Sequence, residues 1–421
     1  MQVSISDYAR VWQLREDFLV FGAPVIGESD IAEVVDTLRS GWIGFGPKCQ
    51  RLEADFAAYL GRPTEHAVAV SSCTAALHLS LVASDVKPGD EVITTPLTFA
   101  ATVNAIMMTG AIPVFVDIDP ATQNIDAAAI AAAVTVRTRA VIPVHMAGRL
   151  CDIAAIRAVA ARYDLSVIED AAHAVEAAEG GVRVGATSPF ACFSFYATKN
   201  MTTGDGGMLL VRDGVAAERV RRLRFHGMSR DAWARYGATG FRHYEIVEPG
   251  FKYSLTDMQA ALGLHQLRRL DSNLAIRESL WAAYDALLRP LNGIRTPQRP
   301  PDSARHARHL YTVEIVPEEL GLSRDEVLNG LTERRVGTGV HFKPVHLHPY
   351  YRDRYGFREG MFPHAEHVGQ TTLSLPLSGG LTLGDVRNVV GALNDIASSV
   401  PRKSISLDEP RHAVLSIGGA R

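Results

Sequence analysis

The chain has 421 residues, of which 47% are hydrophobic and 21% are charged, and its formal net charge at pH 7 is −3. This length accommodates two or three domains with a large core, and the composition is ordinary for a globular protein. The slightly negative charge, together with the lack of a basic block, argues against a nucleic-acid-binding protein.

The cysteines and the chain ends give two further exclusions. The four cysteines are widely spaced and form no CxxC pair, so they predict neither a zinc site nor a disulfide framework: Cys49, Cys73, Cys151 and Cys192. This usage fits a reducing compartment, and we expect a cytoplasmic location. The N-terminus lacks the apolar core of a signal peptide, and no apolar run reaches transmembrane length, so we expect no membrane partner.

The first 25 residues are expected to be an arm, and from about residue 26 short apolar strands alternate with helices. This alternation predicts a parallel or mostly parallel sheet covered on both faces, with ligands bound beyond the carboxyl ends of its strands. The expected strands cover residues 67–72, 90–96, 112–119, 140–148, 165–173 and 189–199, and expected helices cover 74–84, 99–110 and 151–164.

The second half of the chain has a different texture. A long helix is predicted over residues 254–288, because its apolar positions keep helical spacing over many turns. A connector rich in proline and arginine follows, and strands then mix with helices. We therefore expect a large domain over residues 26–265, a smaller C-terminal α+β domain over 266–400 and a polar tail over 401–421.

Lys199 stands directly after the aromatic and small-residue run FSFYAT. A buried ammonium group is costly to desolvate, so such a lysine either reaches solvent or has a lowered pKa. In the second case the amine is a nucleophile that can form a Schiff base. This stretch by itself leaves both interpretations open.

Three features at predicted strand ends bear on this choice. Asp170 closes a strand, and it is either the cap of a following helix or a functional carboxylate. Residues 71–76, SSCTAA, run from a strand into a helix, whose N-terminus is either an anion site or an ordinary cap by Ser72 or Thr74. Phe99 is either a core residue or an aromatic that stacks on a planar ligand.

Ser194 lies five residues before Lys199, so the two side chains share a site only if the backbone turns between them. Pyridoxal phosphate (PLP) would use all of these features, since it needs an imine-forming lysine, an acid at its ring nitrogen, a phosphate cradle and a stacking group. The glycines after Lys199 allow a sharp turn beside such a cofactor. No GxGxxG or Walker pattern predicts a nucleotide in this place.

The order of these stretches resembles the DegT/StrS-type sugar aminotransferases, over nearly the whole chain. The matching stretches include SSCTAALHL, TPLTFAATVNAI, VFVDIDP, VIEDAAHA, FSFYATKNMTTGDGGML, GFKYSLTDMQAALGLHQL and VHFKPVHLHPYYR. The resemblance implies an α/β, fold type I PLP enzyme, with a mostly parallel seven-stranded sheet in the large domain and a smaller C-terminal α+β domain. It also implies a nucleotide-linked keto sugar as substrate, L-glutamate as amino donor and a homodimer with shared active sites.

Carried over by position, the resemblance assigns Lys199 as the Schiff-base lysine and Asp170 as the partner of the pyridinium nitrogen. It places His173 near the cofactor ring and makes Phe99 the stacking aromatic. The phosphate cradle would consist of the amides of Cys73 and Thr74, the hydroxyl of Ser194 and, reaching the cofactor of the neighbouring subunit, Ser254. Relatives usually have glycine or alanine at Cys73, and often asparagine or arginine at Ser254.

The histidine-rich segment VHFKPVHLHPYY lies near the active site in relatives, and we expect His341, His346 and His348 to contact the substrate rather than a metal. Its form favours amination at C4 over C3. A dehydratase branch of the same family replaces the lysine by histidine, so Lys199 argues against that reading. A non-catalytic sensor or scaffold is the alternative, and the loss of Lys199 or Asp170 would mark it.

Overall fold

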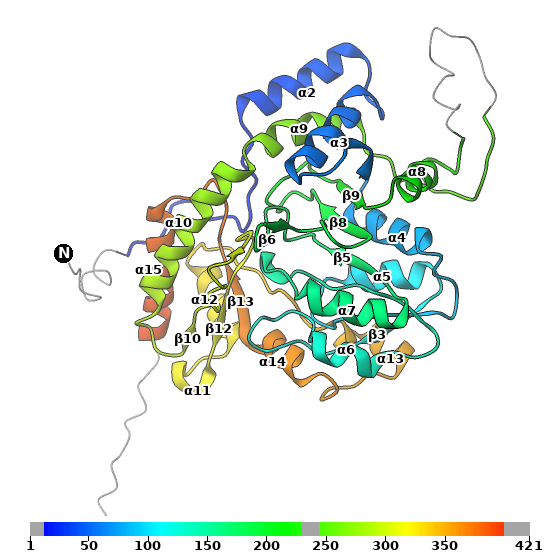
Figure 1. Cartoon of the computed structure of the whole chain (residues 1–421). Helices are drawn as coiled ribbons and strands as arrows, with labels where there is room; N and C mark the ends of the chain where they lie inside the picture. The colour runs from blue at the N-terminus through cyan, green and yellow to red at the C-terminus, as the bar shows by residue number, and fades with distance from the viewer. Residues whose placement is uncertain (1–11, 230–243, 400–421) are drawn as a thin grey trace, which may run out of the picture.

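The computed structural model describes residues 12–229 and 244–399, so the predicted tail and most of the first half of the arm lie outside the described residues. A seven-stranded sheet with the order β1-β9-β8-β5-β4-β2-β3 forms its centre (Figure 1). Neighbouring strands are parallel except where β9 pairs with β1 and β8, which confirms the mostly parallel sheet. The strands are β1 (Ala67–Val70), β2 (Glu91–Thr94), β3 (Ile112–Phe115), β4 (Thr138–Val141), β5 (Ser166–Asp170), β8 (Phe190–Ser194) and β9 (Gly207–Val211).

Both faces of this sheet are covered by helices, because successive side chains of a strand point to opposite faces. Val68, Val70 and the strand side chains that point the same way pack against one layer of helices. This layer consists of α4 (Cys73–Ala83), α5 (Ala100–Met108) and α8 (Gly214–Leu223). Ala67, Ala69 and the strand side chains that point the opposite way pack against the other layer of helices. This layer consists of α3 (Pro47–Tyr59), α6 (Ala127–Ala133), α7 (Ile153–Tyr163) and α9 (Asp257–Arg268). The predicted strands are mostly buried for this reason, whereas β3, at the edge of the sheet, is partly exposed.

Several elements differ from the prediction, and the strands expected over 112–119, 140–148 and 165–173 end earlier, at Phe115, Val141 and Asp170. The strand expected over 189–199 ends at Ser194, and β9 was not predicted, since its run GMLLV is buried throughout and shows no alternation. The single helix expected over 254–288 is two helices, α9 and α10 (Leu270–Leu288), which meet at Arg269. The guanidinium of Arg269 lies 2.8 Å from the buried carboxylate of Asp30 in α2 (Glu28–Ser40), which ties this junction to the N-terminal helix.

A second core belongs to the C-terminal part of the chain. It lies between a three-stranded antiparallel sheet and the helices α10, α12 (Arg324–Glu333) and α15 (Leu383–Ser398). Figure 1 shows α10 and α15 side by side. The strands of this sheet are β10 (Ile294–Arg295), β12 (Tyr311–Ile315) and β13 (Thr372–Leu375).

The remaining elements are short. A third small sheet joins β6 (Ala178–Glu179), β7 (Val182–Arg183) and β11 (Ala304–Arg305). The other helices and turns are η1 (Thr64–His66), η2 (Met146–Gly148), α11 (Pro317–Leu320), η4 (Val345–Leu347), α13 (Pro349–Tyr355) and α14 (Pro363–Thr371).

The two halves of the chain are interleaved rather than separated at one residue. Val345 and Tyr351 of the C-terminal part pack against Val103 in α5 and Phe115 in β3, which belong to the part of the chain that forms the seven-stranded sheet. Leu19 from the N-terminal part packs into the C-terminal core and pairs with Val336. The predicted boundary between residues 265 and 266 falls inside α9, and the division into two domains stays a prediction.

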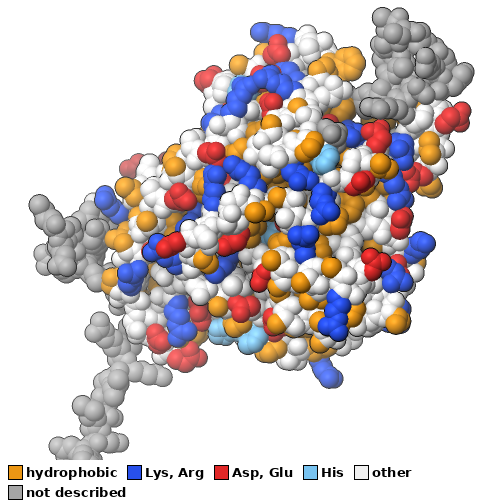
Figure 2. Space-filling view, in the orientation of Figure 1, with side chains coloured by type: hydrophobic (Ala, Val, Ile, Leu, Met, Phe, Trp, Pro, Cys, Tyr) orange, Lys and Arg blue, Asp and Glu red, His pale blue; other side chains and the backbone are white. Residues whose placement is uncertain are grey.

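The surface and the helices bear on the expected partners. Basic and acidic side chains are interspersed on the face shown in Figure 2, in keeping with the formal net charge of −3. Within residues 12–229 and 244–399, the helices are all too short or too polar to cross a membrane.

Candidate active site

The carboxyl ends of β1, β2, β4, β5 and β8 surround a cavity of about 540 Å³. This is the edge at which a parallel sheet places its ligands. Eight of the eleven predicted site residues line the cavity: Cys73, Thr74, Phe99, Asp170, His173, Ser194, Lys199 and His341. The tertiary structure therefore brings together residues that are spread over 269 positions, from residue 73 to residue 341.

Lys199 reaches this cavity from a tight turn that follows β8. The strand ends at Ser194, and the amide of Lys199 donates a hydrogen bond of 2.9 Å to the carbonyl of Tyr196. The backbone thus turns between Ser194 and Lys199, as a shared site requires. Burial lowers the pKa of Lys199 to about 8, and the nearby Asp170 opposes this shift only in part. A substantial fraction of the amine is therefore neutral and nucleophilic near physiological pH.

Asp170 is the last residue of β5 and is 6% exposed. Residues 171–177 form turns, so Asp170 does not cap a helix. Its Oδ2 accepts a hydrogen bond of 2.8 Å from the hydroxyl of Thr102, and its Oδ1 accepts one of 3.2 Å from the amide of Ala172. Burial raises the pKa of Asp170, and no cation of the described residues forms an ion pair with it. A cationic group of a ligand in the cavity would supply the missing partner.

The N-terminus of α4 forms the anion-binding end of the cavity. Ser72 caps the helix by accepting a hydrogen bond of 3.1 Å from the amide of Ala75. The amides of Cys73 and Thr74 lie in the first turn, where no preceding helical carbonyl is available, and the helix dipole favours an anion there. A Cβ atom on Gly207 would lie only 2.8 Å from the nitrogen of Cys73, so a glycine is needed for β9 to approach this turn.

Aromatic rings form the wall beside His173. The ring of His173 lies 4.4 Å from that of His309, and it stacks on Phe342 at 6.1 Å with an interplanar angle of 21°. Its Nδ1 is buried and has no hydrogen-bond partner among the described residues. Burial, together with the positive charge of Lys199, holds the pKa of His173 well below its usual value, so the ring is neutral. Phe99 is 63% exposed and lies 6.0 Å from Phe342.

Sequence reasoning missed several residues of this site: Thr98, Thr102, Tyr196, Asp205, His309 and Phe342. The sequence did indicate Thr102, because it follows Phe99 by three residues on a predicted helix and therefore lies on the same face of that helix. Asn200, next to Lys199, also went unnoticed. Its side chain lies 2.9 Å from His309 Nδ1 and donates to the carboxylate of Glu176 at 2.8 Å, which fastens the turn that carries Lys199.

Three predicted residues lie outside the cavity. His346 is fully buried, with Nε2 2.9 Å from a carboxylate oxygen of Glu366 and its ring against Phe362, so packing holds it away from the cavity. His348 precedes α13 and does not line the cavity either. Ser254 pairs with Val70 at the end of β1, and it too is absent from the cavity of its own chain.

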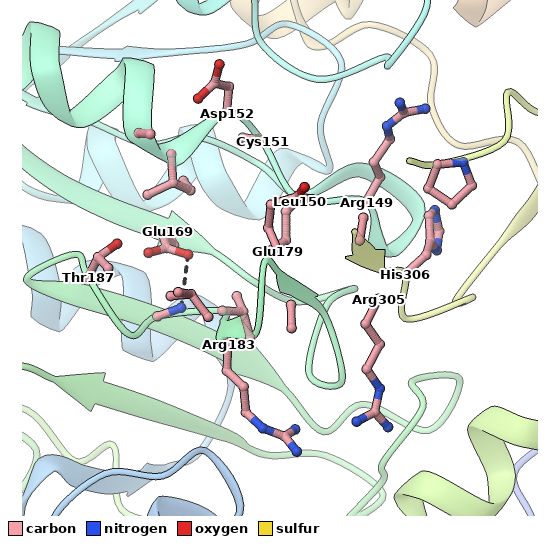
Figure 3. Close-up of a pocket in the computed structure, with 18 of the residues that line it drawn as sticks. Arg149, Leu150, Cys151, Asp152, Glu169, Glu179, Arg183, Thr187, Arg305 and His306 are labelled. Atoms are coloured by element: carbon pink, nitrogen blue, oxygen red, sulfur yellow. Dashed lines mark hydrogen bonds between the residues drawn. The ribbon is translucent and has the colours of Figure 1, made fainter. Parts of the chain in front are cut away.

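A second cavity, also of about 540 Å³, lies on the other side of β5 (Figure 3). Glu169, which precedes Asp170, points to this side, where Oε2 accepts a hydrogen bond of 3.1 Å from the amide of Gly185. Arginines line this cavity, but its described lining residues include no lysine, so it offers no amine for a Schiff base.

The first cavity fits PLP on each point that can be tested with the residues themselves. It has a reactive amine in Lys199, a buried carboxylate in Asp170 that needs a cationic partner, and, at Cys73 and Thr74, a helix N-terminus that can hold a phosphate. The fold and this site define a PLP-dependent transferase of fold type I.

Comparison with known proteins identifies the family. Residues 24–394 match the model of the DegT/DnrJ/EryC1/StrS aminotransferase family, and the chain belongs to this family. It is 48% identical over 385 residues, which is 91% of this chain and 98% of the relative, to the spore coat polysaccharide biosynthesis protein SpsC of Bacillus subtilis (strain 168).

Solved structures agree with this assignment. The PLP form of the putative sugar aminotransferase Spr1654 from Streptococcus pneumoniae has a TM-score of 0.83 at 31% identity, over 90% of this chain and 99% of that chain, and a PMP form of it is also known. PseC of Helicobacter pylori, an aminotransferase involved in the biosynthesis of pseudoaminic acid, has a TM-score of 0.83 at 26% identity, over 91% of this chain and 100% of that chain. The protein is thus a PLP-dependent enzyme of the sugar aminotransferase family.

Proposed function

We propose that this enzyme transfers an amino group from L-glutamate to C4 of a nucleotide-linked keto sugar. The observation that carries the proposal is that Lys199 and Asp170 face one cavity in a chain of the sugar aminotransferase family. The roles of SpsC in spore coat polysaccharide biosynthesis and of PseC in pseudoaminic acid biosynthesis support an amino-sugar product.

The side chains of the cavity have separate tasks in this reaction. When bound, PLP supplies an aldehyde that takes up the amino group and a ring that withdraws electrons from the reacting carbon. Asp170 would keep the ring nitrogen protonated, the amides at the start of α4 would hold the phosphate, and Phe99 would stack on the ring. Lys199, whose pKa burial lowers to about 8 in the cofactor-free cavity, would move a proton between the substrate carbon and the cofactor carbon as general base and general acid.

The sugar would occupy the part of the cavity that His341 lines. His341 Nδ1 lies 2.8 Å from the hydroxyl of Ser374, and burial together with Lys199 lowers the pKa of His341 to about 4. A neutral imidazole at this place can hydrogen-bond a sugar hydroxyl without placing a second positive charge beside Lys199. This supports a role in substrate binding for His341, and the preference for C4 rests on the form of its segment.

We further propose a homodimer in which Ser254 serves the site of the neighbouring subunit. Ser254 lies outside the cavity of its own chain, which supports such a role. Exposed apolar side chains cluster along α2 and just after it, as an obligate two-fold interface would need: Ile31, Leu38, Trp42 and Ile43. The four cysteines, all buried and unpaired, support a cytoplasmic location.

An absorbance titration with amino donors tests the first half of the reaction. L-Glutamate should move the visible band of the PLP-loaded enzyme and release 2-oxoglutarate, whereas L-alanine and L-aspartate should act much more slowly. A panel of nucleotide-linked 3-keto and 4-keto sugars, analysed by mass spectrometry and NMR, then tests the acceptor. Conversion of 3-keto sugars alone would contradict the C4 assignment, and an unchanged band with every donor would favour the sensor or scaffold alternative.

A further inference from the structure

We propose that Thr102 and Thr98 are positioning residues, whose hydroxyls form a one-directional hydrogen-bond chain that holds Asp170 as an ionised acceptor for the ring nitrogen of PLP. The inference concerns the cofactor alone. It is therefore independent of the donor and the sugar proposed above, and its failure and theirs are distinguishable.

The geometry sets the direction of this chain. Thr102 Oγ1 lies 2.8 Å from Asp170 Oδ2 and 2.7 Å from Thr98 Oγ1. An ionised carboxylate only accepts hydrogen bonds, and a hydroxyl has a single proton to donate. Thr102 must therefore donate to Asp170, and Thr98 must donate to Thr102. Each donor polarises the next, which strengthens the bond that reaches the carboxylate.

Both hydroxyls belong to residues that are almost completely buried. Thr98 is 2% exposed and Thr102 is 0% exposed. Thr98 precedes the N-cap residue Phe99, and Thr102 lies in the first turn of α5, so the start of this helix presents both Phe99 to the cavity and the hydroxyl chain to Asp170. A lost hydroxyl would leave Asp170 with an acceptor site that is buried and unpaired.

The other carboxylate oxygen is held from the opposite side. Asp170 Oδ1 accepts from the amide of Ala172 at 3.2 Å, and Cys73 Sγ lies 4.0 Å from it. Donors from α5 and from the turn after β5 thus fix the plane of the carboxylate. Each oxygen can accept about two hydrogen bonds, so capacity remains for a donor in the cavity.

The charges around Asp170 show why a hydroxyl matters there. Lys199, Cys73, Cys192 and His145 are the titratable groups that interact with it. Burial raises the pKa of both thiols, so they add no negative charge. Burial also raises the pKa of Asp170 itself, and the hydrogen bond from Thr102 is the largest influence in the opposite direction, ahead of Ala172, Lys199 and His145.

His145 acts from behind the carboxylate. Its backbone amide donates to the carbonyl of Asp170 at 3.1 Å, while its ring Nε2 lies 2.9 Å from Glu169. Its ring Nδ1 accepts a hydrogen bond of 3.0 Å from the amide of Cys151, so the proton of the ring is on Nε2, toward Glu169. These contacts remain when Thr102 is changed, so a variant at Thr102 isolates the contribution of the hydroxyl chain.

The test is Thr102→Val, which keeps the shape and removes the hydroxyl, with PLP labelled with ¹⁵N in its ring. Solid-state NMR of the loaded enzyme reports the protonation of the ring nitrogen directly. We expect the ¹⁵N resonance to move toward its unprotonated position, and PLP to bind ~10-fold more weakly, because a hydrogen bond to a charged group is lost. The rate of the half-reaction with an amino donor falls at low pH, and the midpoint of this fall should shift to higher pH. The reason is that Asp170 keeps its own proton to higher pH when it no longer accepts a hydrogen bond from Thr102.

Companion variants separate positioning from stability. Thr102→Ser keeps the hydroxyl and should restore the parental resonance, and Thr98→Val should shift it in the same direction by a smaller amount. Thr372→Val is the matched control, because Thr372 is 2% exposed and donates to the carbonyl of Val368 at 2.7 Å, in the C-terminal core. It should lower the Tm without moving the ¹⁵N resonance.

A Thr102→Val enzyme that keeps the parental ¹⁵N resonance and the parental midpoint at low pH, and loses only thermal stability as Thr372→Val does, would overturn the proposal. If Thr102→Val does not fold, Thr98→Val decides the matter, and an unchanged resonance in that variant has the same meaning.

Discussion

A Cβ atom on Gly207 would lie 2.8 Å from the backbone nitrogen of Cys73, so β9 approaches the N-terminus of α4 closely enough to exclude every side chain larger than hydrogen. Gly207 is paired with Ser194 across the β8–β9 ladder. One residue thereby sets the spacing between the helix amides and the hydroxyl that we assign to the phosphate cradle.

Gly207→Ala should push the first turn of α4 away from β9 and distort the cradle. We expect the Kd for PLP to rise by ~10-fold or more, as expected for the loss of one or two charge-assisted hydrogen bonds. Fluorescence titration of the cofactor-free protein measures this. Gly214→Ala is the control, because a Cβ at Gly214 meets no atom within 4 Å and the residue lies at the start of α8. Equal Kd values for PLP in the two variants would contradict the assignment of these groups to the phosphate cradle.

Lys199→Ala should remove the covalent attachment of the cofactor. The parent protein, treated with PLP and borohydride, should carry a stable label on the peptide that contains Lys199, and the variant should carry none. Lys87→Ala, at an exposed lysine far from the cavity, should label as the parent does. Peptide mass spectrometry identifies the labelled residue, and a label on another lysine of the parent would disprove the assignment.

Asp170→Asn keeps the size of the side chain and removes its charge. PLP should still bind, but more weakly, and the half-reaction with glutamate should slow by roughly 100-fold, since a hydrogen-bonded charge contributes ~1.5–3 kcal/mol and each ~1.4 kcal/mol is a factor of ten in rate. Stopped-flow absorbance measures this rate. Asp126→Asn, at the N-cap of α6, should leave it unchanged, because asparagine caps a helix as well as aspartate. A rate within about threefold of the parent in Asp170→Asn would remove Asp170 from the reaction.

The lowered pKa of Lys199 predicts a pH dependence of cofactor capture. In the cofactor-free protein, the neutral fraction of the amine should rise with pH to a midpoint near 8 and then level off, and the rate of PLP capture should follow it. An unfolded lysine keeps its proton up to its ordinary pKa of 10.5, so between pH 8 and 10.5 the unfolded chain binds more protons at residue 199 than the folded protein does. Lys199 should therefore make the free energy of unfolding rise with pH in that window. A capture rate that continues to rise to pH 10 would show that the cavity does not lower this pKa.

Shared active sites predict complementation between inactive chains. Lys199→Ala chains and Ser254→Trp chains should each be inactive as homodimers. In a mixed dimer, the Lys199 of one chain meets the intact Ser254 of the other, so mixing should restore up to about one active site per mixed dimer. Activity after co-refolding measures this, with each chain refolded alone as control. A parent protein that sediments as a monomer and remains fully active would rule the dimer out.

The chemistry of the site was readable from the sequence because its main residues follow apolar strands. Lys199 and Asp170 come at or just after β8 and β5, and the carboxyl ends of parallel strands meet at one edge of the sheet. Local patterns therefore predicted the sheet, the helix over residues 74–84, which the structure has at Cys73–Ala83, and the class of cofactor. The family resemblance extended this to sugar substrates.

Only the tertiary structure decided which of the other polar residues reach the cavity. Nothing in the sequence distinguishes His341, His346 and His348 as substrate-binding candidates. In the structure His341 lines the cavity, whereas the side chain of His346 is buried and lies 2.9 Å from Glu366. Thr102 looks like an ordinary helix residue until β5 places Asp170 beside it. These two contacts join residues that are 68 and 20 positions apart, and they depend on how helices and strands pack, which local periodicity does not encode.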